Sequence, residues 1–66
     1  MGKNLWKVKF NWFGEVITRY THAHSRTNAF SHATYAFAKE LGKTSRYIRY
    51  NAKDVQIWEE EENTYH

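Results

Sequence analysis

The stretch LWKVKFNWFGEVITRYTH, residues 5–22, decides the fold of this chain. From Trp6 to Phe10 an apolar side chain at every second position alternates with a lysine, which is the period of a strand with one buried face. The Asn-Trp-Phe-Gly sequence at 11–14 is typical of a type I turn followed by a glycine bulge. The pattern therefore predicts a β-hairpin.

The expected register gives this hairpin two contrasting faces. A bulged turn pairs Asn11 with Glu15, and the pleat then fixes the other pairs. The apolar face is expected to set Phe10 opposite Val16, Val8 opposite Thr18, and Trp6 opposite Tyr20. The other face is expected to set Lys9 opposite Ile17 and Lys7 opposite Arg19, so it is predicted to be basic.

One main helix is expected over residues 27–41. Ser25 or Thr27 can cap its start, and Gly42 is suited to a left-handed residue at its end. Its expected apolar stripe, at the helical period of 3.6 residues, consists of Ala29, Phe30, Ala33, Phe37 and Leu41. The pattern predicts a helix that packs on one face of a sheet.

Residues 44–59 fit two structures. A second hairpin with its turn at 51–54 would set Ile48 opposite Ile57, and it is favoured because residue types match across the pair. The alternative is a short helix at 44–51 followed by one strand. Either way the fold is α+β, as β-β-α-β-β or β-β-α-α-β, with one main helix on an antiparallel sheet.

Charge divides the chain into a basic body and an acidic end. Ten residues are Lys or Arg and seven are Asp or Glu, and four of the acidic residues are consecutive at Glu59–Glu62. We therefore expect one compact domain over residues 1–58 and a flexible acidic tail over 59–66. A basic body of this kind suits a polyanionic partner, whereas the tail provides solubility or competes for the basic face.

Composition excludes several classes of protein. The 66 residues include no cysteine, so disulfides and thiolate zinc sites are excluded, and aromatic residues make up 18% of the chain. No apolar run approaches the roughly 18 residues of a membrane span or the form of a signal peptide, so a cytoplasmic location is expected. The histidines and serines lack partners at metal-site or catalytic spacing. We expect no enzyme activity, cofactor or metal.

The second hairpin would complete a basic and aromatic surface on the uncovered sheet face. Cations there can follow phosphates while exposed rings stack on bases, which is how single-stranded nucleic acid is bound. The competing interpretation is an ordinary solvated face with lysines that prevent aggregation. The candidate nucleic-acid-binding residues are Lys7, Lys9, Arg19, Arg49, Tyr47 and Trp58.

A protein partner is the second hypothesis. Trp12 and Phe13 are adjacent large aromatics at the hairpin tip, where small polar residues are usual, so they are candidate anchors for a partner protein. The candidate protein-binding residues are Trp12, Phe13, Tyr35 and His32. A third hypothesis is a homodimer that buries Ile17, Tyr47 and Trp58.

The run WKVKFNWFGEV, followed by AFSHATYAFAKELGK, resembles small accessory proteins encoded by bacteriophages of Gram-positive hosts. The resemblance covers residues 6–43 through the hairpin, the glycine turn and the alanine-rich helix. It implies a non-enzymatic binder that acts on a host macromolecule in the host cytoplasm. It assigns no functional residue.

Overall fold

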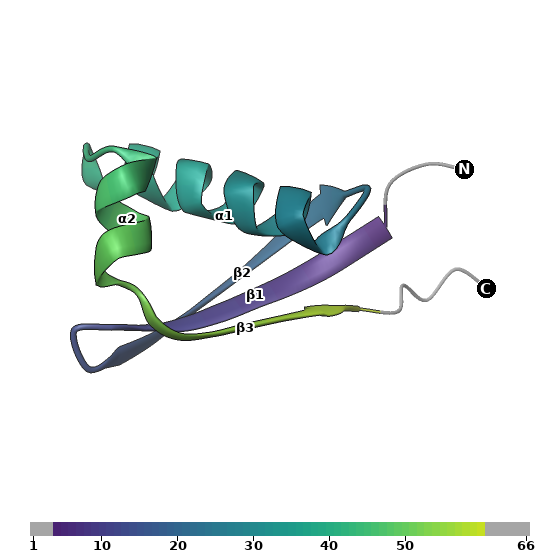
Figure 1. Cartoon of the computed structure of the whole chain (residues 1–66), viewed down its shortest axis with the longest axis horizontal. Helices are drawn as coiled ribbons and strands as arrows, with labels where there is room; N and C mark the ends of the chain where they lie inside the picture. Colours follow the sequence, from purple (N-terminus) through teal and green to yellow (C-terminus); the bar gives the residue numbers. More distant parts are fainter. Residues whose placement is uncertain (1–3, 61–66) are drawn as a thin grey trace.

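The computed structural model describes residues 4–60. Its elements in chain order are β1 (Asn4–Trp12), β2 (Glu15–Ala23), α1 (Arg26–Leu41), α2 (Ser45–Asn51) and β3 (Lys53–Glu59). The strands form an antiparallel sheet in the order β2-β1-β3, and both helices lie on one side of it (Figure 1). The α+β class with one main helix on the sheet is confirmed.

The first hairpin is closed by a two-residue turn. Trp12 pairs with Glu15, so Phe13 and Gly14 alone form the turn, with φ angles of 51° and 87°. Two successive left-handed residues define a type I′ turn, whose twist matches that of the strands. The Gly14 N–H also donates to Oδ1 of Asn11 at 2.8 Å. The predicted bulged turn is therefore wrong by one residue.

That single residue reverses the predicted faces of β2. Because side chains alternate along a strand, a one-residue slip turns every one of them to the opposite side. Buried Val8 lies opposite Arg19, whereas Lys7 lies opposite Tyr20. The faces predicted for β1 are correct, but the predicted pair of Lys7 with Arg19 does not form.

Helix α1 begins and ends where its sequence signals indicated. The Ser25 side chain accepts a hydrogen bond from the Asn28 N–H at 3.2 Å, and Gly42 has φ 71° in a left-handed C-terminal cap. Leu41 is wrong as a core residue because it is 42% exposed. The residues of α1 that are buried are Ala29, Ala33, Thr34, Phe37 and Ala38.

The second predicted hairpin does not form, and the alternative is confirmed, since Ser45–Asn51 is the short helix α2. Thr44 caps it, with Oγ1 accepting from the Tyr47 N–H at 3.2 Å. The helix buries Ile48 completely and leaves Tyr50 exposed. Ala52 leads directly from α2 into β3. Because residues 45–51 are helical, β3 pairs with β1 and not with them.

The core is one apolar layer between the helices and the sheet. Aromatic rings join the two sides, with the Phe37 centroid 5.5 Å from Phe10 and 5.3 Å from Trp12. Such edge-on ring pairs add about 0.5–1.5 kcal/mol beyond burial. The buried apolar residues are Val8, Phe10, Ala23, Ala29, Ala33, Phe37, Ala38 and Ile48. Within residues 4–60, neither helix has the length and apolarity needed to cross a membrane.

The acidic end begins inside the fold. Glu59 is the last residue of β3 and pairs with Trp6, and the Glu60 N–H donates to the Leu5 carbonyl at 2.8 Å. Glu59 and Glu60, the first two residues of the expected tail, are therefore bonded to β1. Residues 61–66, which include the rest of the predicted tail, lie outside the described residues.

The turn predicts a backbone effect on stability. Gly14→Ala should destabilise the protein by about 1 kcal/mol, because a side chain disfavours φ 87° even though a new Cβ would meet no atom within 4 Å. Gly14→Asn should cost less, since asparagine tolerates this region. Urea denaturation measures both, and an unchanged midpoint for Gly14→Ala would contradict the type I′ turn.

The packing of α2 on the core predicts a larger effect on stability than the turn does. Ile48→Ala should cost about 2–5 kcal/mol, because Ile48 is fully buried and truncation leaves a cavity. Tyr50→Ala, in the same helix, is the matched control because Tyr50 is 82% exposed, and it should be close to neutral. Equal effects of the two substitutions in thermal unfolding would show that α2 does not dock as described.

Candidate nucleic-acid interface

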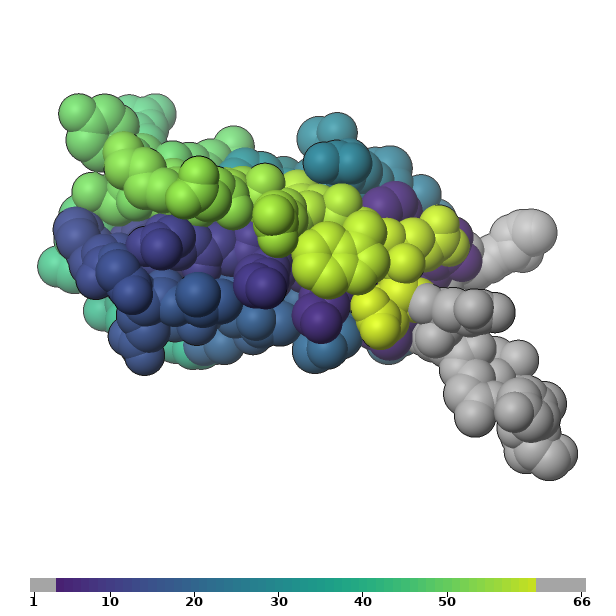
Figure 2. Space-filling model, turned by 90° about the horizontal axis from the view of Figure 1, so that it is seen from below, coloured from purple at the N-terminus to yellow at the C-terminus, as the bar shows by residue number. Residues whose placement is uncertain are grey.

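The side of the sheet away from the helices is here called the open face, and Figure 2 views the molecule from that side. Purple β1 runs between blue β2 and yellow-green β3. Strand alternation places every second residue of each strand on this face. Its central residues are Lys7, Lys9, Val16, Thr18, Tyr20, Gln56 and Trp58.

A cation between two aromatic rings is the most distinctive arrangement on the open face. Lys7 of the middle strand pairs with Tyr20 on one side and Trp58 on the other. Its Nζ lies 5.7 Å from the Tyr20 ring centroid and 5.2 Å from that of Trp58, both within cation–π range. Tyr20 is 55% exposed and Trp58 38% exposed, so both rings remain accessible to solvent.

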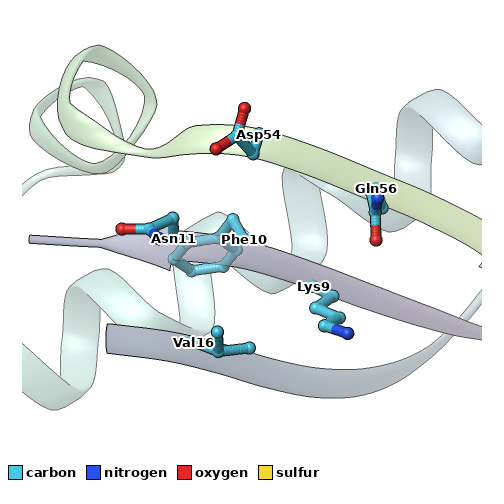
Figure 3. A pocket seen from close by; sticks show the side chains of 6 residues that line it. All are labelled: Lys9, Phe10, Asn11, Val16, Asp54 and Gln56. Atoms are coloured by element: carbon cyan, nitrogen blue, oxygen red, sulfur yellow. The ribbon is translucent and has the colours of Figure 1, made fainter. Parts of the chain in front are cut away.

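A polar hollow lies beside the row formed by Tyr20, Lys7 and Trp58. Lys9 and Asn11 come from β1, Val16 from β2, and Asp54 and Gln56 from β3 (Figure 3). The hollow has a volume of about 230 Å³. Asp54 has φ 51° at the point where the register between β1 and β3 shifts, so a bulge makes the β3 side of the hollow. Phe10 also lines the hollow, and the Gln56 amide points from β3 toward β1, whereas the Asp54 carboxylate points away from it (Figure 3).

Arg19 does not belong to the open face, which corrects the prediction. Its Nη2 and Nε donate to the Glu40 carboxylate at 2.7 and 3.2 Å. Its Nη1 donates to the Thr18 carbonyl at 2.9 Å, and its guanidinium lies 5.2 Å from the Phe37 ring centroid. Arg19 therefore connects β2 to the end of α1, and the Arg19 hydrogen bond lowers the pKa of Glu40.

Arg49 and Tyr47 are also absent from the open face, because they belong to α2 and not to a strand. Arg49 donates from Nη2 to the Ser31 Oγ at 3.0 Å. The Tyr47 ring centroid lies 5.7 Å from that of Trp12. The placement of both residues on the open face depended on the second hairpin, and it is wrong because that hairpin does not form.

The structure thus brings Lys7, Lys9 and Trp58 together, as predicted, and adds Tyr20. Sequence reasoning missed Tyr20 because the assumed register turned it toward the core. A two-residue turn at Phe13 and Gly14 would have placed it beside Lys7.

The candidate protein-binding residues occupy separate places. Trp12 is half-buried against the core, whereas Phe13 is 69% exposed at the hairpin tip. Tyr35, on α1, is 61% exposed. His32 is also on α1, and its Nδ1 lies 3.3 Å from the His22 carbonyl. The Trp12 and Phe13 rings are in contact, with centroids 4.9 Å apart, and protein binding through these residues stays a prediction.

The residues of the predicted homodimer do not share one surface. Ile17 packs against the core on the helix side, and Tyr47 is in α2, whereas Trp58 is on the open face. These side chains therefore lie on different sides of the sheet, and a homodimer that buries all three stays a prediction.

No protein-family model, curated protein or solved structure matches this chain. The resemblance to bacteriophage accessory proteins stays a prediction.

The ion pair of Arg19 with Glu40 predicts a pH-dependent part of stability. Because the pKa of Glu40 is lowered on folding, the stabilisation is complete above the ordinary glutamate pKa of about 4.3 and is lost as pH falls through the lower folded value. The difference in urea midpoint between wild type and Glu40→Gln should shrink over that acid range. A difference that does not change with pH would contradict this role. Arg19→Lys is the control, since it keeps the charge without the two-bond contact.

Proposed function

We propose that this protein is a non-enzymatic module that binds single-stranded nucleic acid on the open face. The observation that carries the proposal is the Lys7 ammonium between the exposed rings of Tyr20 and Trp58. Cations attract the phosphate backbone, and exposed rings stack on bases at about 1–3 kcal/mol per base. All three side chains point away from the core.

The position of the lysines favours this function over a merely solvated face. Lysines commonly keep exposed sheet edges from aggregating, but Lys7 and Lys9 are on β1, the middle strand, where no edge needs protection. Lys7 lies between two aromatic rings, and Lys9 lies two residues further along the same strand, between Thr18 and Gln56. That arrangement suits a ligand that is both anionic and planar.

The spacing of the rings suits separate bases. Tyr20 and Trp58 are on the two strands that flank β1, so their backbones are about 10 Å apart, twice the distance between neighbouring strands. Each ring can therefore stack on a different base while Lys7 meets the phosphate between them. The polar hollow beside Lys9 adds the Gln56 amide, which can bond to the edge of a neighbouring base.

The test is a titration with short single- and double-stranded oligonucleotides that follows tryptophan emission at low and physiological salt. We expect saturable quenching by single strands that weakens steeply with salt. Lys9→Gln should weaken binding across all sequences and reduce the salt slope by about 1. Lys43→Gln removes the same charge from the loop before α2 and should leave binding unchanged.

The Trp58→Phe variant tests whether Trp58 is the tryptophan whose emission is quenched. Trp6 and Trp12 pack against the core on the helix side, so this substitution should remove the quenching while an anisotropy assay still detects binding. Equal losses for Lys9→Gln and Lys43→Gln would reject the open face. No response even at low salt would reject nucleic-acid binding and favour a protein partner at exposed Phe13.

A further inference from the structure

The outer edge of β2 is partly covered by side chains. Trp12 and Glu15 flank the two-residue turn and form a bonded pair, so by alternation the backbone groups of Val16, Thr18, Tyr20 and His22 point away from β1. The Thr18 carbonyl accepts from Arg19, and the His22 carbonyl lies 3.3 Å from Nδ1 of His32. An added strand that ran along Thr18 to His22 would have to displace the Arg19 and His32 side chains.

The outer edge of β3 is different. The Glu60 N–H donates to Leu5, so alternation directs the backbone of Val55, Ile57 and Glu59 away from β1. Over the described range 4–60, β3 pairs with β1 alone, and no side chain bonds to these outward groups. An edge of this kind is a template for another strand.

Apolar surface lies directly beside this open edge. On the helix side, a hollow of about 350 Å³ is lined by Arg26, Thr27, Phe30, Val55 and Ile57. Val55 and Ile57 are only half-buried, although both face the helix layer. The helices therefore leave the inner face of β3 partly uncovered.

We propose that β3 pairs antiparallel with β3 of a second copy of this chain, across a two-fold axis at Gln56. This register sets Val55 opposite Ile57 of the second copy, and symmetry repeats the apolar pair. It also keeps the two Glu59 side chains at opposite ends of the interface. Backbone bonds then form between outward groups on both sides of the axis.

Self-pairing fits this edge better than an unrelated strand. Any extended peptide could supply backbone bonds, but the two-fold register matches apolar with apolar twice and brings the two hollows together on the helix side. A small domain without disulfides also gains stability from association. Because the axis is perpendicular to the sheet, the open faces of both copies lie on the same side and form one continuous surface.

The first test uses wild-type protein without any nucleic acid, so its outcome is independent of the proposed function. Sedimentation equilibrium should show a mass that rises with concentration toward twice 8.0 kDa. Val55→Glu and Ile57→Lys should each abolish this rise. The double variant places opposite charges across the axis twice, so it should restore dimerisation. Circular dichroism checks that each variant is folded.

The second test maps the axis and does not disturb the core. Gln56 faces the open side and would form a non-bonded pair with its copy, where Cα atoms are about 4.5 Å apart, a distance that a disulfide can span. Since the chain has no cysteine, Gln56→Cys in oxidised glutathione should form a disulfide dimer. Thr18→Cys, on the open face of the β2 edge, is the matched control and should not.

The outcomes separate clearly. Selective cross-linking of Gln56→Cys that is lost in urea supports the pairing. A wild-type mass that stays at 8.0 kDa up to millimolar concentration would overturn it. Equal cross-linking of the two cysteine variants would overturn the proposed register. A folded double variant that stays monomeric, when the single variants are also monomeric, would overturn it as well.

Discussion

The two-residue turn at Phe13 and Gly14 is the constraint on which the rest of the structure depends. With both residues in the left-handed region, the strands must pair Trp12 with Glu15. This pairing determines on which side of the sheet each side chain of β2 lies. Arg19 goes to the helix side and Tyr20 to the open face, so the composition of the core and of the candidate interface follows from one local geometry.

This turn is costly for its first residue, and its neighbours offset the cost. A non-glycine residue in the left-handed region costs of order 1–3 kcal/mol, and Phe13 has φ 51°. The Phe13 ring lies 4.9 Å from the Trp12 ring, which in turn packs against Phe37. Turn and core therefore support each other through one chain of aromatic contacts.

Sequence patterns predicted the elements with strong, regular signals. The alternation of β1 and the caps of α1 at Ser25 and Gly42 are short-range features that tertiary contacts did not override. The turn was missed because phenylalanine rarely occupies a left-handed position, so the pattern favoured asparagine and glycine as the turn residues. Lys7 and Lys9 lie on the open face, where the pattern placed them, because the faces of β1 do not depend on that turn.

Residues 45–51 were harder because a helix this short buries a single side chain, Ile48, and so carries almost no period. Arg19, whose predicted face was wrong, shows how many contacts depend on the register of the hairpin. The slip that removes Arg19 from the open face also brings it to Glu40 and to the Thr18 carbonyl, on the outer edge of β2. Because that edge is partly covered, the backbone groups that we propose to pair with another strand are those of β3. The turn thus determines both the charge of the open face and the edge at which the sheet can grow.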